Sequence, residues 1–212
     1  MARSTTKPRP AERRGGDAQT EAAILRAAEE AFSEKGFFDA TVADIVARAG
    51  VSRGTFYFYF GDREDVFLAL LASVVGEMFA LPREREGGIR ERVEASNRAY
   101  FDSFRNHRAF MRSALQMATF NPEAAEALSK LRGRFMERLR GHLERQQASG
   151  RCHDFDVRIV SYAIVMMVEF CAYGWLAFGW NLEDEDFDFD HMVEELSALW
   201  CRALYRAGTA GD

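Results

Sequence analysis

Residues 41–60 read TVADIVARAGVSRGTFYFYF, and this stretch predicts two short helices joined by a sharp turn. Thr41, followed three residues later by Asp44, forms a capping-box pattern that marks the start of a helix. Gly50 ends this helix, because glycine tolerates the left-handed backbone that a helix end requires. Ser52 caps the second helix, which carries many hydrogen-bond donors. This is a helix-turn-helix arrangement, whose second helix fits the major groove of DNA.

Two further helices are expected around this motif. Apolar spacing predicts a helix from Asp17 or Thr20 to Lys35, which Gly36 ends. A fourth helix is expected at 62–81. The aromatic side chains of Phe56 and Phe60 should lie in the core and hold the second helix of the motif in place.

The composition favours an all-α protein. The chain has 212 residues, 48% of them hydrophobic, and only 4 prolines. Its formal net charge of −5 is unusual for a DNA-binding protein, but the distribution of charge matters more than the sum. Within residues 1–16 the only acidic residue is Glu12, among five basic ones. This segment is expected to be a disordered basic arm.

The second part of the chain is expected to hold four or five longer helices. Helical periodicity predicts them at about 89–104, 108–118, 122–147, 156–180 and 190–206, with an acidic loop at 183–190, which makes about nine helices in all. The predicted domains are a disordered arm at 1–16, a three-helix DNA-binding domain at 17–61, a connecting helix at 62–82, and a larger ligand-binding and dimerisation domain at 83–212.

The apolar segment 159–180 allows two readings. Its length would suffice to span a bilayer. However, Glu169 lies near its middle, where a charge is costly in lipid, and Gly174 and Gly179 interrupt it. A buried core or dimer helix is the preferred interpretation. A membrane-associated helical protein remains as an alternative.

No pattern in the sequence indicates catalysis. The chain has no GxSxG motif and no glycine-rich phosphate loop, and its four histidines are scattered. Cys152 and His153 are adjacent but lack further ligands nearby in sequence. We therefore expect no enzyme activity, no cofactor and no metal site. The odd number of cysteines, three, and the lack of a signal-peptide pattern fit a cytoplasmic protein.

The run from Gly36 to Leu71 resembles the DNA-binding domain of TetR-type transcriptional repressors. The resemblance rests on the Thr-Val-x-x-Ile opening, the Ala-Gly-Val-Ser turn, the Gly-Thr-Phe-Tyr-x-Tyr-Phe core and the Asp-Arg-Glu-Asp continuation. It implies a bacterial-type homodimer that binds double-stranded DNA at an inverted repeat. It also implies that the last two helices, with residues 157–180 and 192–205, form part of a four-helix interface between subunits.

Ten residues are predicted to contact DNA. Arg53 is the best candidate for reading a guanine edge, Gly54 allows close approach of the backbone, and Phe58 can touch a thymine methyl group. Hydroxyl groups can donate to phosphates or bases. The resemblance adds contacts to the DNA backbone by Thr41, Val42 and Arg63, although the family often has histidine at the place of Phe58 or Tyr59. The full set is Thr41, Val42, Ser52, Arg53, Gly54, Thr55, Tyr57, Phe58, Tyr59 and Arg63.

Three apolar stripes in the second part of the chain are predicted to converge. A packed core is the simpler explanation, but the chain resembles TetR-type regulators that contain a long hydrophobic tunnel, and this favours a pocket. Glu169 is then either a partner for a ligand or the partner of an arginine such as Arg138. The predicted pocket residues are Tyr100, Phe104, Met111, Leu128, Phe135, Leu139, Val165, Val168, Glu169, Ala172, Tyr173 and Trp200.

The resemblance predicts a repressor that a hydrophobic small molecule releases from DNA by shifting the population of conformations. The fourth helix is expected to act as the lever. A DNA-binding dimer without an effector is the alternative. The operator, the regulated genes, the effector, the sign of regulation and the number of dimers per operator do not follow from the sequence.

Overall fold

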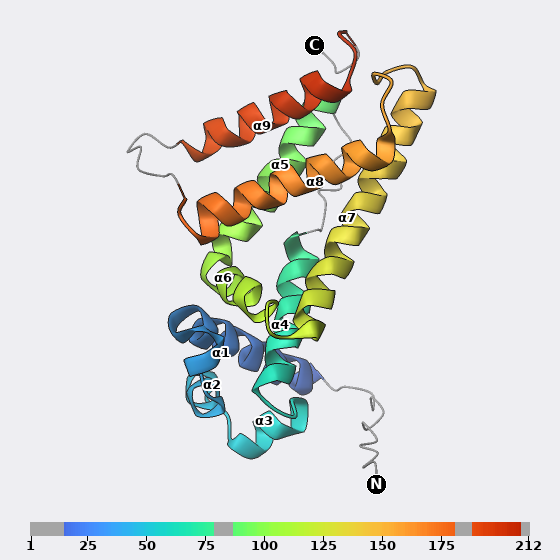
Figure 1. Ribbon diagram of the computed structural model, residues 1–212. Helices are drawn as coiled ribbons and strands as arrows, with labels where there is room; N and C mark the ends of the chain where they lie inside the picture. Colours follow the sequence, from blue (N-terminus) through green and yellow to red (C-terminus); the bar gives the residue numbers. More distant parts are fainter. Residues whose placement is uncertain (1–14, 79–86, 181–187, 209–212) are drawn as a thin grey trace. The chain divides into compact units, whose positions relative to one another are not determined.

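The computed structural model describes residues 15–78, 87–180 and 188–208 (Figure 1). These residues form the helices α1 to α9 and one π-helical turn, with an isolated antiparallel bridge between Cys152 and Tyr205. The all-α prediction is therefore confirmed. Most of the predicted basic arm and of the acidic loop lies outside the described residues.

The chain divides into two compact units, residues 1–70 and 71–212, and the division falls within α4 (Arg63–Met78). The predicted domain boundaries at 61/62 and 82/83 lie on either side of this division. They stay predictions, because compactness alone does not define a functional domain.

The first unit contains α1 (Gly15–Asp39), α2 (Val42–Ala49), α3 (Arg53–Tyr59) and the beginning of α4. The helical path of α1 breaks at Gly36, where φ is 75° and ψ is 171°. The predicted end at Gly36 therefore marks a kink, after which one more turn runs to Asp39.

Local capping sets the bounds of α2 and α3. Thr41 Oγ1 accepts a hydrogen bond from Asp44 N at 3.2 Å, and Asp44 Oδ2 accepts one from Thr41 N at 2.9 Å. Gly50 closes α2 in the left-handed conformation with φ 66°. Ser52 Oγ accepts from Thr55 N at 3.0 Å at the start of α3. The helix-turn-helix predicted from residues 41–60 is confirmed.

Aromatic side chains form the core of the first unit. The ring of Phe67 meets the rings of Phe32 and Phe37 edge-on, each at a centroid distance of 5.0 Å. Phe56 and Phe60 are buried as predicted. Because these two residues anchor one side of α3, its opposite side faces outward.

The second unit consists of longer helices. They are α5 (Ile89–Asn106), α6 (Arg108–Met117), α7 (Pro122–Ala148), α8 (Val157–Ala172), the π-helical turn η1 (Tyr173–Ala177) and α9 (Phe189–Leu204). Their bounds lie within about two residues of the predicted ones, which is the usual uncertainty at helix ends. The exception is the predicted helix 156–180, whose last part is η1.

Within this unit, α9 packs on α5 and α8 packs on α7 (Figure 1). A buried hydrogen bond of 3.0 Å from Asn97 Nδ2 to Ser197 Oγ joins α5 to α9. The loop before α8 is fixed to the end of α9, because His153 N donates to Leu204 O at 3.0 Å. These contacts hold α5, α7 and α9 in one arrangement.

The segment Val157–Ala177 is long and apolar enough to cross a membrane by length and composition alone. Core helices of soluble proteins pass the same test. Of its most apolar window, 33% is buried within the chain. The rest of the segment is half-buried or exposed.

Candidate DNA-binding surface and ligand pocket

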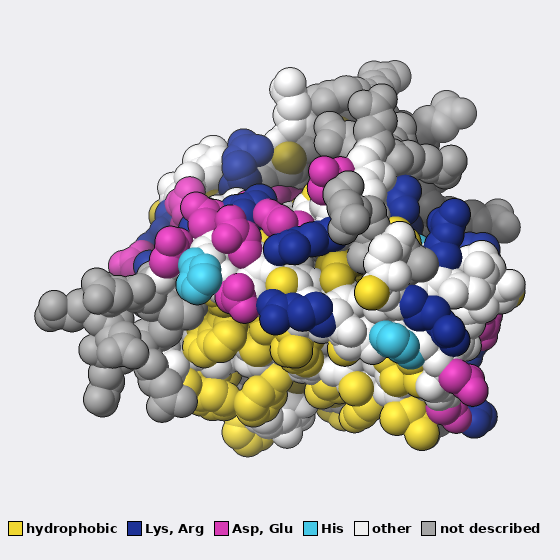
Figure 2. Space-filling view, turned by 90° about the horizontal axis from the view of Figure 1, so that it is seen from above, with side chains coloured by type: hydrophobic (Ala, Val, Ile, Leu, Met, Phe, Trp, Pro, Cys, Tyr) yellow, Lys and Arg dark blue, Asp and Glu magenta, His cyan; other side chains and the backbone are white. Residues whose placement is uncertain are grey.

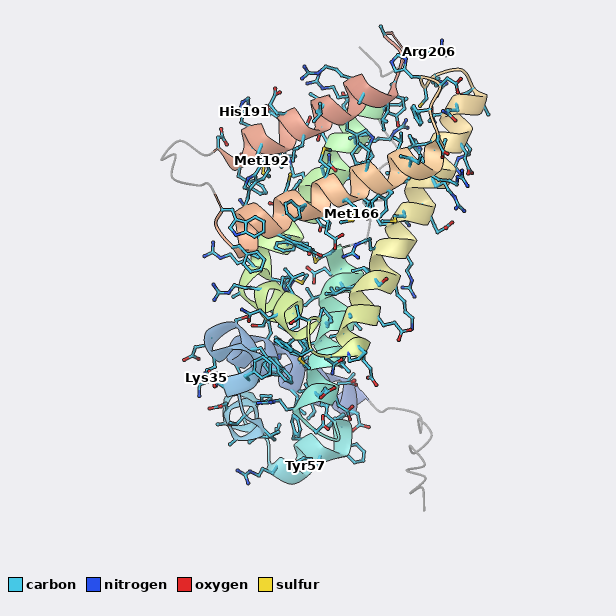
Figure 3. The ribbon with its side chains drawn as sticks, in the orientation of Figure 1. Lys35, Tyr57, Met166, His191, Met192 and Arg206 are labelled. Atoms are coloured by element: carbon cyan, nitrogen blue, oxygen red, sulfur yellow. The ribbon has the colours of Figure 1, made fainter. Side chains whose placement is uncertain are left out.

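The outer side of α3 carries exposed aromatic and polar side chains. Tyr57 is 54% exposed and Phe58 is 77% exposed, and Figure 3 shows Tyr57 at the outer edge of the first unit. Ser52, Arg53 and Gly54 are exposed at the start of the same helix. Large exposed aromatics beside an arginine form a surface suited to base edges and thymine methyl groups.

Arg53 differs from the basic residues near it. Arg48 pairs with Glu34, and Lys35 Nζ lies 2.7 Å from Asp44 Oδ1, a contact that lowers the pKa of the Asp44 carboxyl. Within the described residues, Arg53 makes no ion pair. Its guanidinium is therefore available to a phosphate or a guanine.

Four of the predicted DNA contacts, Thr41, Val42, Ser52 and Thr55, first serve the fold. The hydroxyl of Thr41 takes part in the capping box, and Thr55 Oγ1 lies 2.9 Å from Ser52 Oγ. Val42 is half-buried in the first turn of α2. Hydroxyl groups both donate and accept, so the capping bonds leave them capable of a further contact.

Tyr59 and Arg63 have internal roles that the sequence did not indicate. Tyr59 is half-buried, and its hydroxyl donates to Asp17 Oδ1 at 3.3 Å; burial, reinforced by this carboxylate, raises its pKa. Arg63 Nη1 donates to the carbonyl oxygens of Phe38 and Ala40 at 2.9 and 2.7 Å. These bonds tie α4 to the end of α1. Their predicted contacts with DNA remain predictions.

The predicted ligand residues fall into three groups in the second unit: those around a small cavity, those packed in the core, and those lining a larger pocket. Tyr100, Phe135, Val165, Val168 and Glu169 surround a cavity of about 10 Å³ together with Arg132. This is about the space of one water molecule. Five further residues of the predicted set line neither this cavity nor the larger pocket described below. Four of them are buried in the core and Tyr173 is half-buried; the five are Phe104, Met111, Leu128, Ala172 and Tyr173.

Glu169 is engaged within the protein. Arg132 Nη2 donates to Glu169 Oε1 at 2.8 Å, Arg132 Nε donates to the other carboxylate oxygen, and the Tyr173 hydroxyl donates to Oε1. The hydrogen bond with Glu169 raises the pKa of Arg132, and burial followed by this carboxylate raises that of Tyr173. The suggested partner Arg138 was wrong, because Arg132 is the α7 arginine that reaches α8 at this level.

A larger pocket of about 490 Å³ lies between α5, α7 and the end of α9. This volume falls within the range of about 300–1,000 Å³ that is typical of small-molecule sites. Three predicted residues, Phe135, Leu139 and Trp200, line it. The other lining residues are Ile89, Arg92, Val93, Ser96, Arg138, His142, Arg145, Gln146 and Tyr205.

Two polar atoms of this pocket lack hydrogen-bond partners, and two of its titratable groups have shifted pKa values. Trp200 Nε1 and Gln146 Oε1 are buried without a hydrogen-bond partner among the described residues. Leaving such a group unpaired costs about 1–3 kcal/mol. His142 Nε2 lies 2.8 Å from Tyr205 Oη. Burial lowers the pKa of His142 and raises that of Tyr205. The pocket thus offers both apolar surface and hydrogen-bonding groups.

Apolar periodicity did not predict the polar lining residues, because it marks only the buried side of a helix. Arg138, His142 and Arg145 are spaced at i, i+4 and i+7, which places them on one face of α7. Arg92 and Ser96 repeat the i, i+4 spacing on α5. A search for polar periodicity beside the apolar stripe would have found them.

Sequence comparisons cover both units. The family model described as "Bacterial regulatory proteins, tetR family" matches residues 24–70, and "Tetracyclin repressor-like, C-terminal domain" matches residues 86–176. The HTH-type transcriptional regulator EthR of Mycolicibacterium smegmatis is 33% identical over 135 residues, which are 60% of this chain and 60% of that protein. EthR of Mycobacterium tuberculosis H37Rv is 33% identical over 131 residues, or 59% and 60% of the two chains. The match spans less than two thirds of these relatives.

Solved structures of similar fold include the transcriptional regulator FadR of Bacillus subtilis in complex with stearoyl-CoA. It has a TM-score of 0.67 and 21% identity, and covers 84% of this chain and 96% of its own. A regulator from Saccharomonospora viridis in complex with choline has a TM-score of 0.75 and 16% identity, with coverage of 89% and 99%. At these identities the likeness shows the fold alone. The two family matches, the helix-turn-helix and the helical second unit together show that the chain belongs to the TetR family of DNA-binding transcriptional regulators, which are not enzymes.

Proposed function

We propose that this regulator is a repressor that binds an inverted-repeat operator as a homodimer and leaves it when a mostly hydrophobic small molecule binds the second unit. The observation that carries the proposal is the pocket of about 490 Å³ between α5, α7 and α9. A chain that only dimerises would not need such a space. We place the protein in the cytoplasm, where bacterial DNA lies.

The exposed side of α3 supports direct reading of the operator. Arg53 is positioned at the first turn of the helix and has no ion pair with a described residue. The buried Phe56 fixes the helix from behind. Two such helices related by a two-fold axis would enter successive major grooves about 34–36 Å apart, so the operator should be an inverted repeat.

The dimer surface is proposed to lie on α8 and α9. Ile159, Tyr162 and Phe170 on α8 are between 56% and 67% exposed, and Leu199 on α9 is 52% exposed. Figure 2 shows hydrophobic side chains gathered along one side of the face that it presents. Exposed apolar surface of this kind marks an interaction site, and a second copy of the same helices would cover it.

The effector is proposed to act by population shift. A ligand that binds better to a conformation unsuited to the operator releases DNA by its difference in affinity for the two states. The helix α4 contains residues of both compact units, which makes it the natural connection between ligand and DNA. The complexes of FadR with stearoyl-CoA and of the Saccharomonospora regulator with choline support ligand binding within this fold.

Genome-wide recovery of bound DNA fragments tests the first half of the proposal. We expect one or a few sites that contain an inverted repeat. A screen of apolar compounds tests the second half. Fluorescence anisotropy measures whether a compound releases the purified protein from such a site. Binding without any preferred sequence would refute the role as an operator-specific repressor.

A further inference from the structure

Three arginines line the pocket between α5, α7 and α9. They are Arg92 on α5, and Arg138 and Arg145 on α7. Within the described residues, none of the three forms an ion pair, and no aspartate or glutamate lines the pocket. Of the other arginines on these two helices, Arg98, Arg105, Arg132 and Arg140 find carboxylates, whereas Arg90 and Arg134 form no ion pair with a described residue.

The position of these charges is as informative as their number. Arg138 and Arg145 are exposed and Arg92 is half-buried, so the guanidinium groups belong to the rim of the pocket. Apolar side chains such as Val93 and Leu139 are buried and lie deeper. A basic rim above an apolar floor matches a ligand with an acidic end and an apolar body.

The two unpartnered polar atoms of the pocket differ: Gln146 Oε1 needs a donor, whereas the buried donor of Trp200 supports the same polarity as the arginines. Trp200 is 5% exposed, and its Nε1 has no hydrogen-bond partner among the described residues although the residue lines the pocket. An indole nitrogen can only donate a hydrogen bond. It therefore requires an acceptor, and an acidic ligand supplies one.

We infer that the effector is an amphiphile whose acidic group is bound by Arg92, Arg138 and Arg145 and accepts a hydrogen bond from Trp200 Nε1, while its apolar body lies against the buried side chains of α5 and α7. This inference rests on the proposed function, because it names the chemical class of the effector. It leaves no role for Glu169 as a partner for the ligand, since that carboxylate is already bound by Arg132 and Tyr173.

The test compares three probes with the same alkyl chain on the full-length protein: decanoate, decanol and decylamine. Calorimetry should show decanoate binding about tenfold more tightly than the other two, as charge-assisted hydrogen bonds require. The variant Arg138→Gln/Arg145→Gln should lose about tenfold in affinity for decanoate and keep its affinity for decanol. Trp200→Phe should also weaken decanoate more than decanol.

The matched control is Arg134→Gln/Arg140→Gln, which removes two charges from the same helix at positions that do not line the pocket. It should leave decanoate binding unchanged. Equal affinity for the three probes, a preference for decylamine, no binding of any probe, or equal loss in both double variants would overturn the inference. Operator release is measured separately. Decanoate that binds as expected without releasing DNA would refute the proposed function and leave the acidic-ligand site standing.

Discussion

At the scale of single residues, we expect recognition of the DNA sequence to depend most on Arg53. Arg53 is exposed in the first turn of α3. From this position an arginine can form a bidentate contact with the edge of a guanine. We expect Arg53→Ala to weaken binding to the operator by about 1–3 kcal/mol, and to weaken binding to random duplex much less. Fluorescence anisotropy with both duplexes at one salt concentration measures the two losses.

The control for Arg53 is Arg26→Ala, which removes the same charge from an exposed position on α1. We expect little difference between operator and random duplex in that variant. If Arg53→Ala lowers both affinities equally, then Arg53 contacts only phosphate and other residues of α3 read the sequence.

His142 should make the stability of the fold depend on pH. Burial, followed by the nearby positive charges of Arg145 and Arg92, lowers its pKa below the ordinary value of 6.5. The unfolded chain therefore binds more protons than the folded one just below pH 6.5, so the free energy of unfolding falls as pH is lowered through this window. Urea unfolding at several pH values should show this slope, and His142→Gln should reduce it. The exposed His153→Gln should leave it unchanged.

At the scale of helices, one buried polar contact joins α5 to α9 within their apolar packing. Ser197→Ala leaves the Asn97 amide buried without its partner, and we expect it to lower the free energy of unfolding by about 1–3 kcal/mol. Ser96→Ala on α5 is the control, because the bond that Ser96 Oγ makes within the described part of the chain is to the carbonyl of Arg92 in its own helix. That change should be nearly neutral. Equal urea midpoints for the two variants would show that the contact does not hold the helices together.

Helix positions were predictable because their signals are local. The Thr41–Asp44 capping box and the left-handed Gly50 act within a few residues, and both are present as expected. Partners across helices were not predictable in the same way. Arg132 and Arg138 are both on α7, and periodicity alone did not show which of them reaches Glu169. That choice depends on how far α7 and α8 are shifted along each other, which the spacing within one helix does not determine.

At the scale of the whole molecule, the same limit explains the pocket. The apolar stripes were correctly assigned to helices, yet residues such as Tyr100 and Val168 enclose only about 10 Å³. Tight packing removes space wherever apolar side chains of different helices interdigitate. Space remains between α5, α7 and the end of α9, where arginines replace apolar residues at the rim. The faces of three helices together, rather than any one of them, determine where the pocket lies.

Dimerisation is a property of the whole molecule that single substitutions can test. Ile159 is 67% and Leu199 is 52% exposed, on the helices proposed to meet their copies across the two-fold axis. A glutamate at either position would have to be buried without a partner in such an interface. We therefore expect Ile159→Glu and Leu199→Glu to raise the dimer dissociation constant by at least about tenfold, and to weaken operator binding with it. Light scattering over a dilution series measures this. Phe120→Glu, at a position 75% exposed beyond α6, should stay dimeric. Dimers of unchanged affinity in both interface variants would place the contact on other helices.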